Sequence, residues 1–413
     1  MASQSYGKTF TLPVGIGLVI AIGLLFSDLQ IPALSMWTDF ARLYYPCLHL
    51  AAAGQFGEIY KLLPGVVADA SAIGRIYAAF VPPSETFFEM PCTIWLMRPL
   101  AHVELSYAQA IWHCCSFFAL AFTVYLISRA AAVMELDAEA GDIGWACLTF
   151  APIFMTLWLA QLGLVFGILP LAIGYYFLSH KKPLLAGLAW GFLIMKPAFL
   201  IVAAVNAIAQ IMQKKFRCLV GLIASLGVFL YIAQTLPGSN VWLDNWQSFS
   251  TQPQLDPRLN ISLAHTMLSF IAESNRAPWQ QIVLFLGVFI AFGGFTQLKL
   301  LIEHEDKKHE IVPFATIMGC LLVPFMAPNL PFFDLSVLCF AGLVVHCIEW
   351  REHMEWRIQT LNRMYWLCIN IYILVFYFAR EFAHPAELLV LFLVFFMRLI
   401  EAIRFSAHTP NFE

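Results

Sequence analysis

Charged side chains are scarce in this chain. Asp, Glu, Lys and Arg make up 12% of the 413 residues, against roughly 25% in soluble globular domains, while 61% of the residues are hydrophobic and the mean hydropathy is +0.76. A soluble domain does not have this composition. The chain is therefore predicted to be an integral membrane protein.

Several other sequence patterns are missing, and each absence excludes a class of protein or a kind of site. The net charge is -3 with no basic tail, which excludes a nucleic-acid binding protein, because neutralising phosphates needs clustered Lys and Arg. The ten cysteines form no C-x-x-C pair, so no zinc site or disulfide framework is predicted. Cys47 and Cys92 would pair only on an oxidising side of the membrane and would otherwise stay free thiols.

Long apolar runs are abundant. A bilayer crossing needs about 20 apolar residues, and twelve stretches approach that length. The first is longer than the core of a signal peptide and is predicted to be an uncleaved span. The twelve stretches are 10–27, 105–128, 143–159, 162–179, 184–195, 197–213, 218–236, 281–302, 312–328, 331–349, 364–380 and 386–404.

The basic residues predict an orientation, because Lys and Arg are retained in the cytoplasm. With both termini cytoplasmic, fifteen basic residues lie inside and eight outside, provided that 184–213 crosses twice. Residues 28–104 and 237–280 then form two large extracytoplasmic loops within a single domain, 1–413. The apolar piece "FFEMPCTIWLMRPLAHV" in the first loop is interrupted by Pro91, Arg98 and Pro99, which favours an interfacial helix over a crossing.

Three acidic or basic positions stand out against the apolar background. Asp39 follows the first span by about a dozen residues. Its simplest interpretation is an N-cap, because Thr38 and Asp39 open a helix-like run that Gly54 would close. Lys196 lies inside "GFLIMKPAFL", either as a functional intramembrane cation or as a snorkelling lysine at a break marked by Pro197. Asp334 opens a span after a proline-rich turn, where a helix N-terminal carboxylate is also ordinary.

The second loop adds polar groups just before the chain returns to lipid. The segment "NWQSFSTQPQLDPRLNISLAHTML" offers Arg258, Asn260, Ser262 and His265. Hydroxyl, amide and guanidinium groups suit a sugar or a phosphate, although an outer loop of this composition is usually only solvated. We expect no metal site in either loop.

Short motifs in a fixed order give these residues a context. They are "TDFARLYY", "AAAGQFGEIY", "VPPSETFFEMPCTIWLMRPL", "LAQLGLVFGILPL", "AGLAWGFLIMKP", "NISL" and "APNLPFFDL". From about residue 37 to 340 this order resembles glycosyltransferase family 87, the polyprenol-phosphate-mannose-dependent mannosyltransferases of the GT-C fold. The resemblance implies an all-α polytopic membrane protein, a GT-C-type bundle of about twelve transmembrane helices with extracytoplasmic juxtamembrane helices in the first loop.

The resemblance also implies an inverting sugar transfer at the outer membrane face, with Asp39 as the general base. A phosphate leaves as a stable anion, so one carboxylate is enough to take the acceptor proton, whereas an inverting glycosidase needs two. No cofactor and no metal are expected. The candidate donor-phosphate ligands are Lys196, Arg258, Arg98 and His265, and the candidate sugar or acceptor ligands are Tyr44, Tyr45, Asn260 and Asp334.

The expected partners are a polyprenyl-phosphate-linked sugar, a glycolipid or glycan acceptor and membrane lipid, in the inner or plasma membrane of a bacterium. Mannose leads among the sugars by the family pattern, and the acceptor stays open. Two other classes stay open as well. A secondary transporter would suit many spans and an intramembrane lysine, but the chain lacks the internal repeats usual there. A non-catalytic subunit of a cell-envelope complex would tolerate the loss of Asp39.

Overall fold

The computed structural model describes residues 6–30, 38–59, 90–134, 140–237, 276–303, 310–327, 332–352 and 370. Nearly all of these residues are helical, and no strand occurs among them. The first part of the chain forms α1 (Tyr6–Gln30), η1 (Phe40–Tyr44), α3 (Tyr45–Ala52), α4 (Phe56–Ile59), α6 (Pro91–Met97), η3 (Arg98–His102), α7 (Leu105–Val133), α8 (Ala140–Leu148) and α9 (Ala151–Trp158).

The remaining described elements are α-helices together with short 3₁₀ or π-helical segments. They are η4 (Gly163–Ile168), α10 (Leu169–Ser179), α11 (Pro183–Gly191), η5 (Phe192–Met195), η6 (Pro197–Phe199), α12 (Leu200–Met212), α13 (Arg217–Thr235), α16 (Arg276–Glu303), α17 (Ile311–Met326), η9 (Phe332–Leu335) and α18 (Ser336–Glu352). Of these, η4 and the earlier η1 are π-helices, while η5, η6 and η9 are 3₁₀ turns.

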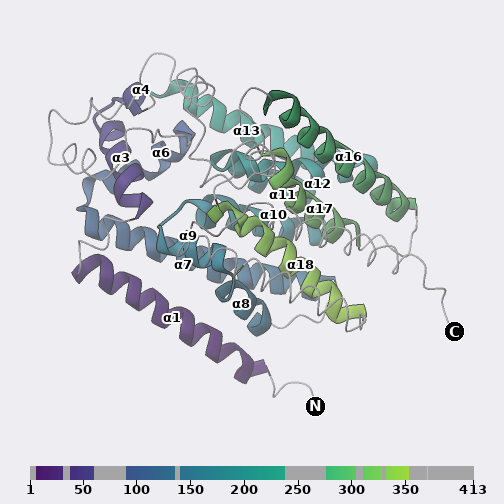
Figure 1. Cartoon of the computed structure of the whole chain (residues 1–413), viewed down its shortest axis with the longest axis horizontal. Helices are drawn as coiled ribbons and strands as arrows, with labels where there is room; N and C mark the ends of the chain where they lie inside the picture. The colour runs from purple at the N-terminus through teal and green to yellow at the C-terminus, as the bar shows by residue number, and fades with distance from the viewer. Residues whose placement is uncertain are drawn as a thin grey trace.

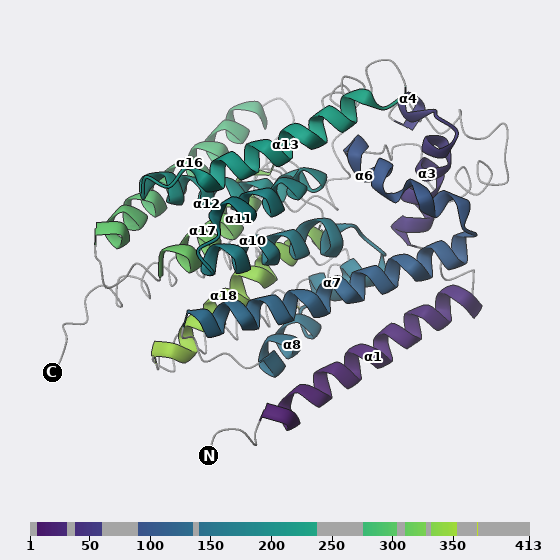
Figure 2. The same cartoon turned by 180° about the vertical axis from the view of Figure 1, so that it is seen from behind.

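The long helices lie side by side along one direction (Figure 1). At one edge α1 packs on α7 and α8, and towards the other edge α16 packs on α17. The short helices α3, α4 and α6 gather at one end of the long helices, as the reverse view also shows (Figure 2). This end of the bundle contains the polar residues of the candidate site.

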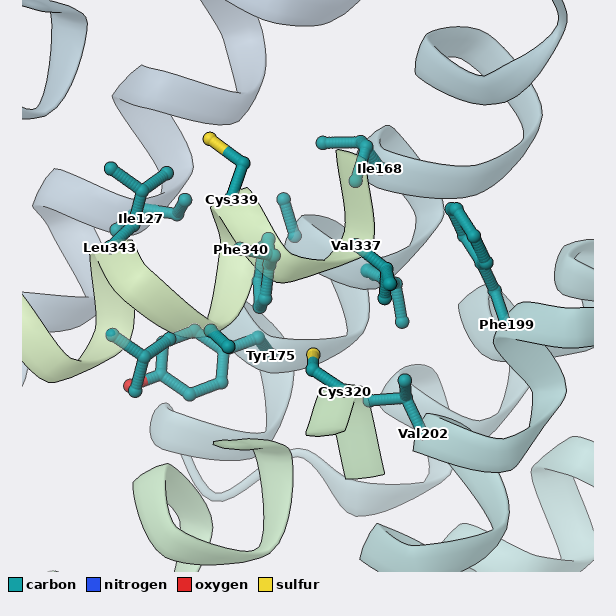
Figure 3. Packing of buried hydrophobic residues seen from close by; sticks show 14 of the residues in the cluster. Ile127, Ile168, Tyr175, Phe199, Val202, Cys320, Val337, Cys339, Phe340 and Leu343 are labelled. Atoms are coloured by element: carbon teal, nitrogen blue, oxygen red, sulfur yellow. The ribbon is translucent and has the colours of Figure 1, made fainter. Parts of the chain in front are cut away.

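The centre of the bundle is an apolar core shared by helices far apart in the sequence (Figure 3). Tyr175 of α10 meets Phe340 of α18 edge to face, with ring centroids 5.8 Å apart. Such aromatic pairs contribute about 0.5–1.5 kcal/mol beyond the area they bury. The core fixes α10 and α18 relative to each other, and with them the elements η4 and η9 that precede these helices.

Most of the predicted spans coincide with described helices. The ten stretches between 10 and 349 fall on described helical elements, whereas 364–380 and 386–404 lie outside the described residues. The stretch 143–159 is not one continuous helix, because α8 ends at Leu148 and α9 begins at Ala151 after an extended Phe150. Pro152 explains the restart, since proline is favoured in the first turn of a helix.

Two of the described helices, α7 and α13, are long and apolar enough to cross a membrane. Several shorter apolar helices accompany them, among them α12 and α17. Large apolar side chains also face outward from the long helices, including Val19 at 70% exposure and Phe289 at 74%. Both features indicate a membrane protein.

Glycines bring α11 and α13 into close contact. Gly187 and Gly191 of α11, in the motif "GLAWG", face Gly221 and Ser225 of α13 at the same four-residue spacing. A Cβ atom at Gly187 would overlap the carbonyl oxygen of Cys218 on α13, and it would also lie 2.7 Å from a second backbone atom of that helix. Small residues in this arrangement are the usual means of packing helices inside a membrane.

Adding one methyl group at this contact should weaken the fold. Because the atoms that a Cβ at Gly187 would meet belong to the backbone of α13, they cannot rotate away, and Gly187→Ala should lower the free energy of unfolding by about 1–3 kcal/mol. Gly227→Ala is the matched control, since a Cβ there meets nothing within 4 Å. Thermal unfolding in detergent measures both, and an unchanged midpoint for Gly187→Ala would contradict the close contact.

Candidate active site

Asp39 immediately precedes the short π-helix η1, at its N-cap position, but its side chain does not cap the helix. The neighbouring Thr38 provides the cap, because its hydroxyl accepts a hydrogen bond from the Ala41 backbone N–H at 3.2 Å. The Asp39 side chain makes no capping hydrogen bond. The run continues into α3, and Gly54 follows its end with a φ of 78°. The predicted helix is therefore confirmed, while the interpretation of Asp39 as an N-cap carboxylate is wrong.

The Asp39 carboxylate is instead held by an amide from another part of the chain. Gln161 donates a hydrogen bond from Nε2 to Oδ2 of Asp39. The other end of the same amide, Oε1, accepts a hydrogen bond from the Tyr44 hydroxyl at 2.8 Å. The backbone N–H of Asp39 also donates to the carbonyl of Leu159 at 3.0 Å. Asp39 thus has both its backbone and its carboxylate fixed by the segment after α9.

The turn that carries Gln161 has an unusual backbone. Ala160 has a φ of 52°, in the left-handed region that residues other than glycine rarely adopt, and its side chain is fully buried. Such residues cost about 1–3 kcal/mol and persist only where the surroundings fix them, which happens most often at functional sites. The two π-helices η1 and η4, which begin just after Asp39 and just after this turn, are also a feature enriched at functional sites.

Removing the amide of Gln161 should release the carboxylate. A hydrogen bond to a charged group contributes about 1.5–3 kcal/mol, so Gln161→Leu should lower kcat by roughly 10- to 100-fold if Asp39 must be oriented. Gln213→Leu is the matched control, because Gln213 lies at the end of α12 and its side-chain hydrogen bonds, to the Ala209 carbonyl and from the Lys215 ammonium, join near neighbours in the sequence. Equal rates for Gln161→Leu and the unchanged protein would contradict an orienting role.

Lys196 lies in the break between α11 and α12. The chain leaves the helix there, with φ and ψ of -132° and 77°, and resumes in the turn that starts at Pro197. The predicted break is confirmed. The side chain does not snorkel, however, because Lys196 is only 6% exposed and its Nζ lies 3.5 Å from Oδ1 of Asp334, which is 5% exposed. Lys196 and Asp334 form a buried ion pair.

The neighbours of two glycines in η4 show how this ion pair lies relative to Asp39. A Cβ atom at Gly163 would lie 3.7 Å from Oδ1 of Asp334, so Asp334 approaches the turn that carries Gln161. A Cβ atom at Gly167 would overlap the ring of Phe199, just beyond Lys196. Gly163 follows Gln161 by two residues, and two residues of chain span at most about 7 Å. The Asp39 carboxylate and Asp334 of the ion pair therefore both lie close to one short turn, 159–163.

The other predicted site residues have different positions. Tyr44 contacts Gln161 and so lies in the same hydrogen-bonded group as Asp39. Tyr45 directs its hydroxyl to the Val103 carbonyl, at 2.7 Å, within the first loop. Arg98 is exposed at the start of η3. The remaining three predicted ligands, Arg258, Asn260 and His265, lie outside the described residues.

The surroundings of α3 keep its titratable groups uncharged. Burial raises the pKa of the Tyr45 phenol, and the nearby Glu104 carboxylate acts in the same direction, so the hydroxyl stays a donor. Burial lowers the pKa of His49, and the neighbouring His102 adds to this effect. Burial also raises the pKa of the Cys47 thiol, and both Cys47 and Cys92 are free thiols. Tyr45, Cys47 and His49 are thus uncharged at neutral pH.

A second polar cluster lies next to Asp39 and was not predicted from the sequence. Asp28 at the end of α1 is 2% exposed and accepts a hydrogen bond from Gln109 Nε2 at 2.6 Å. Its other oxygen lies 2.5 Å from Nδ1 of His113. Asp28 is a single carboxylate at the end of one apolar run, and His113 is a histidine inside another. No sequence pattern links the two. A titratable residue inside a predicted span was the only available signal.

The fold and the site together define a helical membrane protein with a carboxylate oriented by an amide beside a buried lysine. The family model for glycosyltransferase family 87 matches residues 87–328, more than half of the chain, so the chain belongs to glycosyltransferase family 87. Gln161 and Lys196 lie within the matched residues, whereas Asp39 and Asp334 lie outside them. No curated protein and no solved structure matches the chain. The protein is a glycosyltransferase, and it binds a sugar donor and an acceptor.

Proposed function

We propose that this glycosyltransferase transfers a sugar, with inversion, from a polyprenyl phosphate to an acceptor hydroxyl at the extracytoplasmic membrane face, with Asp39 as general base. The sugar is mannose by the family pattern, and the acceptor is a glycolipid or a glycan. The observation that carries the proposal is the hydrogen bond from the Gln161 amide to the partly exposed Asp39 carboxylate. A general base must be held in one orientation towards the proton that it removes.

The chemistry follows from the nature of the leaving group. The acceptor hydroxyl gives its proton to the Asp39 carboxylate while its oxygen forms a bond to the anomeric carbon. The bond from that carbon to the phosphate oxygen breaks on the opposite face, and the polyprenyl phosphate keeps the electron pair. Since this anion is stable without a proton, no second acid is needed, and cations stabilise the developing charge.

Lys196 is the strongest candidate for the donor phosphate among the described residues. Its ammonium is buried but carries three donors, so it can keep the Asp334 contact and still bind a phosphate oxygen. The other proposed phosphate ligands are Arg98, Arg258 and His265. The proposed ligands of the sugar or the acceptor are Tyr44, Tyr45, Asn260 and Asp334, with Tyr44 and Asp334 nearest the turn 159–163.

A multi-pass membrane topology suits a lipid-borne donor. The apolar side chains exposed on α1, α7, α13 and α16 would contact lipid. We propose about twelve transmembrane helices with both termini cytoplasmic, in a bacterial inner or plasma membrane. The seven residues of α6 are too few to cross a bilayer, which needs about 20. This supports an interfacial first loop, whose side of the bilayer would then hold Asp39.

Direct transfer tests the proposal. The purified full-length protein is incubated with radiolabelled polyprenyl-phosphate mannose and a lipid extract of the host, and the labelled product is isolated. We expect a new glycolipid or glycan whose anomeric configuration, measured by NMR coupling, is opposite to that of the donor. Retention of configuration would contradict the single-base mechanism. Transfer only from a nucleotide sugar would contradict the lipid donor.

One observation favours a different function, namely secondary transport. A buried Lys–Asp pair within apolar helices is a common feature of ion and substrate pathways. A transporter would move a small or lipid-linked solute across proteoliposome membranes without forming a glycosidic bond. Its rate would depend on Lys196 and Asp334 and would tolerate Asp39→Asn. A non-catalytic subunit would tolerate Asp39→Asn and keep its assembly without transferring sugar.

A further inference from the structure

Asp28 and His113 have a geometry that the proposed chemistry does not use. His113 is buried in α7, and both of its ring nitrogens have an acceptor as partner. Nε2 lies 2.9 Å from the Leu157 carbonyl, which can only accept, so this nitrogen carries a proton. Nδ1 lies 2.5 Å from Oδ2 of Asp28, within hydrogen-bond distance of that carboxyl group.

The pair continues through Gln109 towards the catalytic segment. Gln109 donates from Nε2 to Oδ1 of Asp28 at 2.6 Å, and its Oε1 accepts from the Thr38 hydroxyl at 2.8 Å. Thr38 in turn accepts from the backbone of Ala41. Because the Ala41 N–H can only donate, the Thr38 hydroxyl accepts there and donates to Oε1 of Gln109, which leaves Nε2 of Gln109 to donate to Asp28.

Together with two short stretches of backbone, these hydrogen bonds form a closed ring that includes Asp39. The chain runs from Ala41 through Thr38, Gln109, Asp28 and His113 to the Leu157 carbonyl at the end of α9. Two residues further on, the Leu159 carbonyl accepts the backbone N–H of Asp39, which closes the ring. The next side chain that points to the site is Gln161, the residue that holds the Asp39 carboxylate.

We infer that His113 and Asp28 are positioning residues for Asp39, acting through Gln109 and Thr38 on one side and through the end of α9 on the other. They touch neither donor nor acceptor. The ring ties the end of α1 to α7 and α9 and sets where the turn 159–163 lies relative to η1. This inference rests on the proposed function of Asp39 as general base.

The alternative is that the ring only stabilises the fold, and a double-mutant comparison separates the two. His113→Gln and Thr38→Val each break the ring, the second without leaving a buried charge unpaired. If the ring acts through Asp39, each substitution should lower kcat by about 10- to 100-fold, since a displacement of about 1 Å can cost that much, and should leave the donor KM within about twofold. In the Asp39→Asn background, the same substitutions should change the residual rate by less than about twofold.

Two further variants make the test specific. Thr38→Ser keeps the hydroxyl and should restore most of the activity that Thr38→Val loses. Ser116→Ala removes a buried hydroxyl one turn along α7, outside the ring, and should leave kcat unchanged. All variants are assayed as full-length protein in nanodiscs, with thermal unfolding recorded alongside.

The outcomes separate this inference from the proposed function. An equal fold-loss from His113→Gln with Asp39 present and in the Asp39→Asn background would overturn it, as would an increase in the donor KM at unchanged kcat. Full activity of Thr38→Val would also overturn it while leaving Asp39 as the base. Full activity of Asp39→Asn would remove the proposed function and this inference together. A loss of kcat that occurs only when Asp39 is present supports both.

Discussion

Replacing Asp39 with asparagine lowers kcat by about 10²- to 10⁴-fold, the usual contribution of a general base, and leaves the donor KM nearly unchanged. The reason is chemical, because the amide of asparagine cannot accept the proton of the acceptor hydroxyl. The fold should not change, since the asparagine side-chain oxygen can still accept the hydrogen bond from Gln161. Initial rates with a radiolabelled polyprenyl-phosphate sugar, at varied donor concentration, measure both parameters.

The control for this substitution is Glu104→Gln. Glu104 is an exposed carboxylate of the same loop, at the start of α7, and makes no capping hydrogen bond there. Its replacement removes one negative charge and should leave the rate unchanged. Should Asp39→Asn transfer sugar at the normal rate, Asp39 is not the base. Loss of transfer in both variants would indicate a general effect of charge.

Replacing Lys196 with methionine should destabilise the protein by about 3–5 kcal/mol, because it leaves the Asp334 carboxylate buried without its partner. The methionine fills a similar volume, so the loss is chiefly electrostatic. Unfolding followed by tryptophan fluorescence in detergent and denaturant measures it. The control is Lys299→Met in α16. Lys299 pairs with Glu303, and the two side chains are 68% and 57% exposed. Exposed pairs contribute little, so its midpoint should stay unchanged.

A second substitution separates stability from chemistry at this pair. In Lys196→Met/Asp334→Leu both charges are gone, and replacing a buried ion pair with apolar groups is often neutral or stabilising. Stability should therefore recover. Activity should not recover, because the ammonium proposed for the donor phosphate is absent. Recovery of both would contradict the phosphate role of Lys196, and recovery of neither would contradict the assignment of a simple buried pair.

The helices of this protein could be predicted from the sequence because their signals are local. Apolar runs of the right length predicted the long helices from α1 to α18, and Pro197 predicted the break at Lys196. The interruption within 143–159 was missed, since Thr149 and Phe150 are compatible with a helix and only Pro152 marks the restart. Whether the chain forms about twelve spans depends also on 364–380 and 386–404, which lie outside the described residues.

The site could be predicted only one residue at a time. Asp39, Lys196 and Asp334 stood out because each is charged in an apolar context. Their partners did not, because Lys196 and Asp334 are brought together by the fold across distant parts of the chain. Gln161 was part of a quoted motif, but nothing in that motif shows which carboxylate it binds. His113 resembles any histidine of an apolar helix until its carboxylate partner is seen beside it.

The wide turn of η4 has a consequence for the spacing of the chain at the site. A π-helix holds one residue more per turn than an α-helix, and one residue corresponds to about 100° of rotation around the helix axis. Deleting a single residue between Gly163 and Ile168 would allow this segment to wind as an ordinary α-helix into α10. Closing the wide turn would remove the surplus residue together with its share of the rotation, so the turn 159–163 and the Gln161 amide should keep their position relative to α10, which is locked in the core. The wide turn of η4 thus holds one additional residue between Gln161 and the core without displacing either.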